Sequence, residues 1–396
     1  MISDKKKKNN DELNVGRRNF FKTGAALGTV MLIDPIINKV NAGQSLLSSD
    51  SFTFDTSNFN TPTITQKRTL GSGQFGMEVS ALGFGVMGMN YNRGSHPDRK
   101  NAIRLLHQTV DYGVNLFDTA EVYGPFINEE LAGEALSLYK NKVFITTKFG
   151  HDIVNGKGTG LLNSRPEHIK KVAEESLKRL KIDSIPLFYQ HRFDPNIPIE
   201  DVAGTVKELI EQGKVQRFGL CEVNPEIIRR AHAVQPITAI QSEYHLMWRV
   251  QEENVLPLLE ELRIGFVPYS PINRGFLGGT LNEYTKLGPN NDNRANLPRF
   301  TPEAMRNNYR IVEVLNDFGR TRGLTSAQIA LAWLLSRKSW IVPIPGTTKL
   351  SHLEENLRSV NISFTNEEWR ELEQAISTIS IVGDRYNAEE QQKINN

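Results

Sequence analysis

The chain has 396 residues, of which 39% are hydrophobic and 23% charged, as is typical of a globular protein long enough to bury a large core. Its 47 basic and 45 acidic residues nearly balance, and no long basic stripe follows the extreme N-terminus, so nucleic acid is not an expected partner. A single cysteine excludes an intramolecular disulfide, and the eight histidines lack the spacing of a metal site, so no metal is expected.

The first 42 residues carry the features of an export signal. Lysines at 5–8 precede the stretch "GRRNFFK" at 16–22, and an apolar run of ten residues follows at 24–33. This run is much shorter than the roughly 20 residues that a membrane span needs. The tripeptide "VNA" then favours cleavage before Gly43. Residues 1–42 therefore resemble a twin-arginine signal peptide.

The resemblance to this signal depends on Arg17 and Arg18. It predicts export to the periplasm by the twin-arginine translocation machinery, and the short apolar run and the lack of a lipid-acceptor cysteine predict no permanent membrane anchor. The alternative is a basic, frayed N-terminal helix. Residues 43–65 are rich in Ser, Thr and Asn, show no lasting periodicity, and are interpreted as a linker or irregular cap.

From residue 66 to 396, short apolar runs alternate with amphipathic segments. The runs at 66–70 and 77–82 flank the turn "GSGQFG" and predict a β-hairpin. Helical periodicity fills the intervals between later strands, as at 98–113 and 165–181. This alternation predicts an α/β fold, a (β/α)8 TIM barrel with the N-terminal β-hairpin closing the barrel bottom. The eight predicted barrel strands lie at 82–86, 115–120, 142–149, 185–191, 216–221, 238–244, 265–270 and 341–345.

Two glycine patterns of the G-x-G-x-x-G type suggest a dinucleotide-binding Rossmann fold, but neither has the required context. One links the strands of the predicted hairpin, and the other runs into a loop where the motif needs an immediate helix. A Rossmann site is therefore not expected. The two patterns are Gly71, Gly73 and Gly76, and Gly83, Gly85 and Gly88.

Four ionisable residues fall at or just after the ends of three successive predicted strands, which meet at one mouth of a barrel: Asp118, Tyr123, Lys148 and His191. They favour carbonyl reduction, because the alkoxide formed by hydride addition needs a proton donor. Tyr123 is the predicted donor, and Lys148 is the cation expected to bring its pKa, ordinarily about 10, toward neutrality. Asp118 is expected to pair with Lys148, and His191 to donate a hydrogen bond to the carbonyl oxygen.

The motifs around these residues, "FDTAEVYG", "ITTKFG" and "LFYQHR", resemble the tetrad motifs of the aldo/keto reductases. The similarity extends from about Gln66 to "GDRY" at 383–386, and it is closest to the microbial branch with "SALGFGVMGM" and "IPGTTK". The resemblance implies a (β/α)8 barrel that binds NADP(H), with NAD(H) as the alternative, extended across the barrel mouth. It also implies a small-molecule aldehyde, ketone or alcohol as substrate, with Tyr123 as the proton donor.

The resemblance also assigns coenzyme contacts. Tyr269 would stack on the nicotinamide, Ser270 would lie beside the pyrophosphate, and Gln241 would meet the carboxamide. The adenosine phosphate would contact the segment that holds Thr347, Thr348, Lys349, Glu355 and Asn356.

Three positions depart from the pattern of the better-known family members. Glu222 matches the microbial branch, where those relatives have an asparagine. Cys221 stands where a serine normally meets the carboxamide, and a thiol is a weaker hydrogen-bond donor. His352 stands where an arginine normally meets the 2′-phosphate, so a preference for NADP(H) depends on Lys349 and the two threonines.

Two other functions stay open at this point. Lys148 at a barrel strand end fits a Schiff-base lyase or aldolase, and a coenzyme-binding sensor with little turnover would retain the same motifs. No feature selects a sugar, an aryl aldehyde or a ketosteroid as substrate. Loops at 280–300 and 150–166 are interpreted as lids, and the pocket candidates are Tyr91, Phe126, Trp248 and Arg249.

Overall fold

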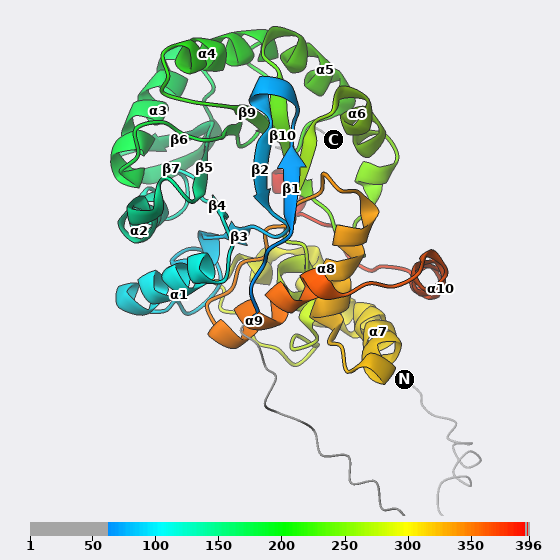
Figure 1. Ribbon diagram of the computed structural model, residues 1–396. Helices are drawn as coiled ribbons and strands as arrows, with labels where there is room; N and C mark the ends of the chain where they lie inside the picture. The colour runs from blue at the N-terminus through cyan, green and yellow to red at the C-terminus, as the bar shows by residue number, and fades with distance from the viewer. Residues whose placement is uncertain (1–61, 393, 395–396) are drawn as a thin grey trace, which may run out of the picture. The chain divides into compact units, whose positions relative to one another are not determined.

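The computed structural model describes residues 62–392 and 394, all within the compact unit Phe59–Asn396 (Figure 1). The predicted signal peptide and nearly all of the predicted linker lie outside the described residues. Ile64 is already part of the barrel, because its side chain is buried and its amide donates to the carbonyl of Tyr112 at 2.8 Å.

A sheet of seven parallel strands forms the core, in the order β11-β10-β9-β8-β5-β4-β3. Six of these strands lie within the predicted apolar runs, β10 begins one residue before its predicted run, and the predicted (β/α)8 barrel is confirmed. The strands are β3 (Phe84–Gly85), β4 (Leu116–Asp118), β5 (Phe144–Phe149), β8 (Phe188–Gln190), β9 (Phe218–Cys221), β10 (Ile237–Glu243) and β11 (Gly265–Tyr269).

The eighth predicted strand, 341–345, closes the ring without forming a full ladder. The amides of Val342 and Ile344 donate to β11, at 2.9 and 3.1 Å, while the carbonyls of Pro343 and Pro345 accept from β3, at 2.9 and 3.3 Å. Proline has no amide hydrogen, so the segment cannot donate toward β3. On the β3 side the hydrogen bonds therefore run in one direction only, whereas on the β11 side the amide of Phe266 also donates to the carbonyl of Trp340, at 3.0 Å.

Close backbone approach at this seam explains one of the glycine patterns. A Cβ atom added at Gly83 would lie 2.8 Å from Ile344, and one at Gly346 would lie 2.5 Å from the carbonyl oxygen of Gly85. These glycines serve the packing of β3 against 341–346.

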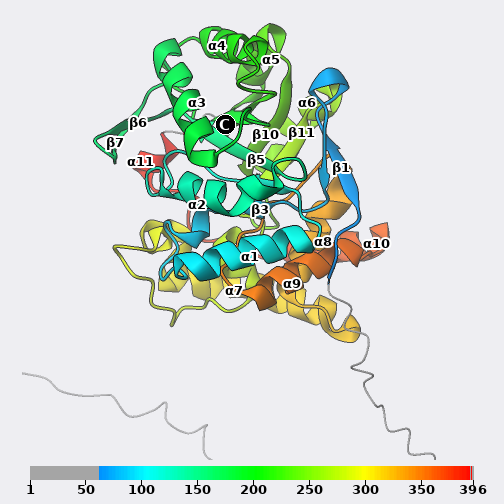
Figure 2. The same ribbon diagram turned by 60° about the vertical axis from the view of Figure 1, so that its left-hand side comes forward.

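Helices surround the sheet (Figures 1 and 2). Their starts follow local chemistry: Asp98 caps α1 by accepting from the amide of Asn101, Pro166 opens α3 as predicted, and Thr325 and Gln328 form a capping box on α8. The helices are α1 (Arg99–Asp111), α2 (Ile127–Leu136), α3 (Pro166–Leu180), α4 (Ile199–Glu211), α5 (Pro225–Val234), α6 (Val255–Leu262), α7 (Pro302–Gly319), α8 (Ser326–Arg337), α9 (Leu350–Arg358), α10 (Asn366–Ser377) and α11 (Ala388–Gln391).

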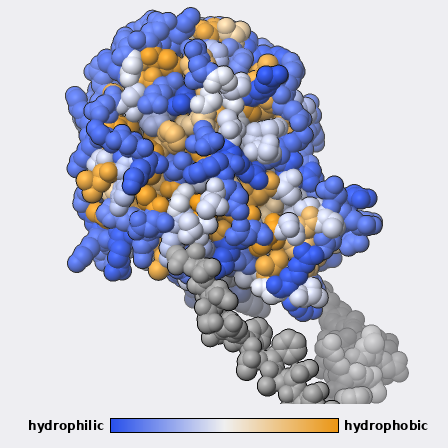
Figure 3. Space-filling view, in the orientation of Figure 1, coloured by the Kyte–Doolittle hydropathy of each residue, from blue (hydrophilic) through white to orange (hydrophobic). Residues whose placement is uncertain are grey.

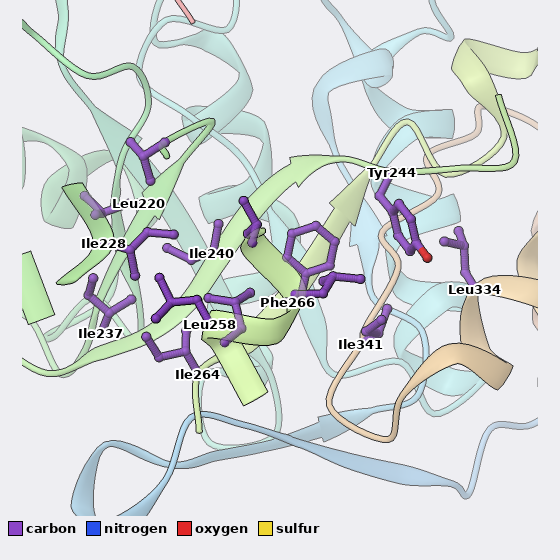
Figure 4. Close-up of a cluster of buried hydrophobic side chains, with 14 of the residues drawn as sticks. Leu220, Ile228, Ile237, Ile240, Tyr244, Leu258, Ile264, Phe266, Leu334 and Ile341 are labelled. Carbon is purple, nitrogen blue, oxygen red and sulfur yellow. The ribbon is translucent and has the colours of Figure 1, made fainter. Parts of the chain in front are cut away.

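Side chains along each strand point alternately outward to the helices and inward to the barrel interior, and so form two layers. Outward-facing residues such as Ile240 and Phe266 pack with Leu258 of α6 and Leu334 of α8 (Figure 4). Their neighbours along the strands face the barrel interior. The side chains of Asp118, Lys148 and Gln241 lie on this inner side, where they contact one another.

The predicted hairpin, β1 (Lys67–Leu70) paired with β2 (Met77–Ser80), lies at the end of the barrel where the strands begin. Leu70 packs into the barrel interior, and a Cβ atom on Gly265 at the start of β11 would lie only 2.5 Å from it. Thr238 at the start of β10 donates to the carbonyl of Phe75 at 2.9 Å. The hairpin therefore closes the bottom of the barrel.

The segment 150–166, interpreted from sequence as a loop, contains a second hairpin, β6 (His151–Val154) and β7 (Lys157–Leu162). It projects beside α3 and is mostly exposed (Figure 2). The segment 280–300 is largely irregular, with short 3-10 turns at Asn293–Asn296 and Pro298–Phe300.

The face seen in Figure 3 is largely hydrophilic, with hydrophobic residues scattered over it. Within the part of the chain that the structure describes, none of the helices combines the length and the apolar character needed to cross a membrane.

Candidate active site

The four predicted catalytic residues meet at the C-terminal mouth of the barrel. Asp118 ends β4, Lys148 lies near the end of β5, and His191 follows β8 directly, while Tyr123 sits in the turn between β4 and α2. Lys148 is fully buried, and Asp118 and His191 are 4% and 9% exposed. The expected convergence of these strand ends therefore brings all four side chains together.

Lys148 is the centre of the site. Its ammonium donates to Asp118 Oδ1, to the carbonyl oxygen of Thr119 at 2.7 Å and to the hydroxyl of Tyr123 at 3.4 Å. Asp118 Oδ2 in turn accepts from Thr146 Oγ1 at 2.9 Å. The ammonium thus has three oxygen partners, one of which is the predicted proton donor.

The environment keeps Lys148 charged. Burial is the largest single influence and lowers the pKa of the ammonium, but Asp118, Tyr123 and Cys221 together raise it more, and the pKa ends above its usual value. A Schiff base forms only from a neutral amine. The ion pair with Asp118 therefore disfavours the lyase alternative.

Tyr123 is held in its neutral form. Burial raises its pKa and Lys148 lowers it, but burial prevails, so the pKa lies above the ordinary value of 10.0. The sequence predicts that Lys148 brings this pKa toward neutrality. Lys148 does lower the pKa of Tyr123, but burial raises it by more. Tyr123 therefore carries its proton at neutral pH.

His191 is neutral. Burial lowers its pKa well below the usual value, and the nearby His151 lowers it further. Its ring meets the ring of Tyr123 edge-on at 5.6 Å and the ring of His151 at 4.9 Å. Tyr91 stacks on the other side of Tyr123, with ring centroids 5.7 Å apart. His151 is a neighbour of the site that the sequence did not single out.

Gln241 has a partner that the sequence did not predict. Its Nε2 donates to Asp118 Oδ2 at 2.9 Å, and its side chain is 3% exposed. The amide nitrogen is therefore engaged within the protein.

Cys221 lies in the barrel interior beside Tyr189 and Val267. Burial raises the pKa of its thiol to about 12. The thiol therefore stays protonated at neutral pH and is not nucleophilic.

The loop after β11 is strained. Ser270, Asn273 and Arg274 have φ angles of 49°, 47° and 53°, followed by Gly275 at 95°. A left-handed conformation costs a non-glycine residue about 1–2 kcal/mol, and such strain clusters at functional sites. The Tyr269 hydroxyl, just before this loop, lies 2.9 Å from the hydroxyl of Tyr386.

The predicted adenosine-phosphate segment surrounds the start of α9. Thr347 and Thr348 are half-buried, and Lys349 is the exposed N-cap residue of the helix. Helix N-termini favour anions. Farther along α9, Glu355 is half-buried and Asn356 is 4% exposed.

A buried ionic network that sequence reasoning missed supports this mouth. Arg274 forms two hydrogen bonds with Glu243, at 2.7 and 2.8 Å, and Arg385 forms two with Glu222, at 3.0 and 2.8 Å. Arg385 also lies over the ring of Tyr386, 4.9 Å from its centroid. The "GDRY" motif was visible in the sequence, but its partners lie far away along the chain.

The four residues predicted to line the substrate pocket lie in different surroundings. Tyr91 contacts Tyr123, but Phe126 packs under the guanidinium of Arg179 at 4.4 Å. Arg249 pairs with Glu252 and Glu373, both outside the predicted catalytic tetrad. Trp248 lies between the guanidinium groups of Arg299 and Arg385, at 5.1 and 4.8 Å.

Among residues 62–392 and 394, no group of three or more His, Cys, Asp or Glu side chains is arranged to hold a metal ion.

Comparison with known proteins agrees with this geometry. A sequence model of the aldo/keto reductase family matches residues 81–377. The chain is 40% identical over 315 residues to a probable aldo-keto reductase 1 of Glycine max, covering 79% of this chain and 90% of that protein.

Solved structures share the fold. The glycerol dehydrogenase AKR11B4 from Gluconobacter oxydans has a TM-score of 0.71 and 26% identity, covering 81% of this chain and 98% of the other. The thermostable aldo-keto reductase Tm1743, solved with the inhibitor epalrestat, has a TM-score of 0.63 and 26% identity over 78% and 99% of the two chains. AKR11C1 from Bacillus halodurans, at 23% identity and a TM-score of 0.64 over 82% and 99%, supports the fold alone.

The fold and the site define an oxidoreductase built on a (β/α)8 barrel. The chain belongs to the aldo/keto reductase family.

Proposed function

We propose that this protein is an exported, NADP(H)-dependent reductase of aldehydes or ketones that also oxidises the corresponding alcohols. The observation that carries the proposal is the arrangement of a neutral phenol, a buried ammonium and a neutral imidazole around one point, at Tyr123, Lys148 and His191.

The bound coenzyme supplies or accepts the hydride. Tyr123 donates its proton to the alkoxide that hydride addition creates, and Lys148 stabilises the resulting phenolate at 3.4 Å. Asp118 holds the ammonium in place. His191 orients the carbonyl by donating a hydrogen bond to its oxygen.

The residues present fit a nicotinamide dinucleotide. Tyr269 offers a ring at the mouth, and the strained Ser270–Gly275 loop is the kind of backbone that approaches a pyrophosphate closely. The N-terminus of α9, with its two threonines and Lys349, suits a phosphate. Lys349 is the group that favours NADP(H) over NAD(H), because His352 stands where an arginine is expected.

Replacing Tyr123 by Phe tests the catalytic assignment. The purified wild type is assayed with NADPH and NADH against a panel of aldehydes and ketones. The panel includes products of small polar alcohols, because one structural relative is named a glycerol dehydrogenase. Tyr123→Phe is expected to lower kcat by about 10²- to 10⁴-fold while coenzyme affinity stays unchanged. Full activity of the variant, or no hydride transfer in the wild type with either coenzyme, contradicts the proposal.

The twin-arginine signal supports a second part of the proposal. This pathway is associated with folded cargo, so the enzyme would load coenzyme before export and recycle it in place. The absorbance spectrum of protein purified from the periplasm, followed by extraction of the nucleotide, is expected to show bound NADP(H). Protein that arrives empty and exchanges both redox forms rapidly contradicts retention.

A further inference from the structure

A cavity of about 400 Å³ lies beside the β6–β7 hairpin, against α3. None of the predicted catalytic or coenzyme-binding residues lines it. Its walls are partly apolar, with Phe126, Ile153 and Val172, and partly acidic, with Glu121, Asp152 and Glu175. The cavity therefore combines an apolar surface large enough for an alkyl group with three carboxyl groups.

Two buried polar atoms of residues that line this cavity have no hydrogen-bond partner in the described part of the chain. They are Glu121 Oε1, on a side chain only 2% exposed, and His168 Nε2. A buried polar atom without a partner costs about 1–3 kcal/mol. This cost points to a ligand group that supplies hydrogen-bond donors.

The two residues hold opposite sides of one peptide segment. The carboxyl group of Glu121 accepts hydrogen bonds from the backbone amides of Gly150 and His151, and His168 hydrogen-bonds the backbone of His151. Burial lowers the pKa of His168, so its ring is neutral. A neutral ring that donates through one nitrogen presents the other, Nε2, as an acceptor.

We propose that this cavity is a binding site for a small organic cation, whose primary ammonium group lies between Glu121 and His168 and whose alkyl part packs on Phe126 and Val172. The ammonium has three N–H donors, which match Glu121 Oε1, His168 Nε2 and the acidic rim. Lys171, which also lines the cavity, is exposed and lies 3.9 Å from Glu175. The ring of His151 contacts His191 at 4.9 Å, so the site is one side chain away from the catalytic group.

Binding is expected to depend on pH. Burial and the neighbouring Glu129 raise the pKa of Glu121 to about 8. A cation binds the ionised carboxylate, so affinity rises as pH increases from 6 toward 8 and then levels off. The charged and titratable groups that face Glu121 and the cavity are Glu129 of α2, His151 and Asp152 of β6, and His168, Lys171, Glu175 and Arg179 of α3.

Ethylammonium chloride, titrated into the protein by calorimetry against potassium chloride at equal ionic strength, tests the site. The wild type is expected to show saturable binding that strengthens from pH 6 to 8. Glu121→Gln removes the charge with little change in shape, and should raise Kd by about ten- to a hundredfold and abolish the pH dependence. His168→Phe should weaken binding while leaving its pH dependence in place.

Glu174→Gln is the matched control, because Glu174 lies on the same helix, pairs with Lys214 and does not line the cavity. Its Kd should equal that of the wild type. If Glu121→Gln does not fold, His168→Phe carries the test alone. Absence of saturable ethylammonium binding, or equal binding by the wild type and the foldable cavity variants, overturns the proposal and leaves the cavity to water. These measurements do not depend on enzymatic activity.

Discussion

Gln241 donates a hydrogen bond to Asp118 across the barrel interior, over 2.9 Å, although three strands separate β10 from β4 in the sheet order. Asp118 also accepts from Lys148 and Thr146. One carboxylate therefore links three strands at Lys148, the lysine that we propose supports catalysis.

Gln241→Leu is expected to destabilise the protein by about 2 kcal/mol, because hydrogen bonds to charged groups contribute about 1.5–3 kcal/mol. Urea unfolding measures the difference. Gln190→Leu is a matched control: Gln190 is also buried, but it donates to the neutral hydroxyl of Ser164, at 2.9 Å. Its loss should cost about 1 kcal/mol. Equal costs at the two positions would show that the charge on Asp118 does not strengthen its bond.

The pH dependence of reduction follows from two pKa shifts. Tyr123 must carry a proton, and its raised pKa keeps that proton until the pH exceeds about 10. The lowered pKa of His191 keeps its ring neutral through the usual histidine range near 6.5. The profile of kcat in the reduction direction should therefore be flat between these limits and fall at its alkaline end. A change in kcat centred near pH 6.5 that disappears in His191→Asn would contradict the neutral assignment.

Arg385→Met should strongly destabilise the fold. It leaves Glu222 buried without its bidentate partner, which costs about 3–5 kcal/mol in comparable buried pairs. Arg229→Met removes an equally well-formed pair with Glu261 at the surface and should leave the unfolding midpoint unchanged. Similar midpoints for the two variants would argue against the network as an anchor of the C-terminal segment.

Lys349→Met tests coenzyme preference. Loss of the ammonium at the start of α9 should raise the Kd for NADPH by about tenfold. The Kd for NADH should stay the same and serves as the internal control. Fluorescence titration with both coenzymes measures the ratio. A parallel change for both coenzymes would assign Lys349 to helix stability and not to the 2′-phosphate.

Export should depend on the arginine pair. Replacing both Arg17 and Arg18 by Lys preserves charge but should retain the protein in the cytoplasm. Fractionation with antibody detection measures the distribution, and Lys7→Arg with Lys8→Arg is the matched control. Periplasmic accumulation of the double-lysine variant would contradict the twin-arginine assignment.

Local sequence patterns predicted the strands, the bottom hairpin and the tetrad, because these depend on alternation along one strand and on where the strand ends. They could not predict that Gln241 would bind Asp118 or that Arg385 would bind Glu222, since these contacts join residues 123 and 163 positions apart. The protonation of Tyr123 also escaped prediction. The direction of its pKa shift depends on whether the effect of burial exceeds that of the charge on Lys148. The sequence does not show how deeply a residue in a turn is buried.

The half-ladder at residues 341–345 has a mechanical consequence. Hydrogen bonds that run in one direction only between this segment and β3 give the ring a preferred line of opening, between its first and last units. The segment predicted to hold the adenosine phosphate begins at Thr347, two residues beyond Pro345. A dinucleotide that spans the mouth would therefore fasten the ring where it is weakest, and exchange of the Gly83 and Gly85 amides with solvent would slow when it binds. We therefore expect the coenzyme to stabilise the closed barrel in addition to taking part in the reaction.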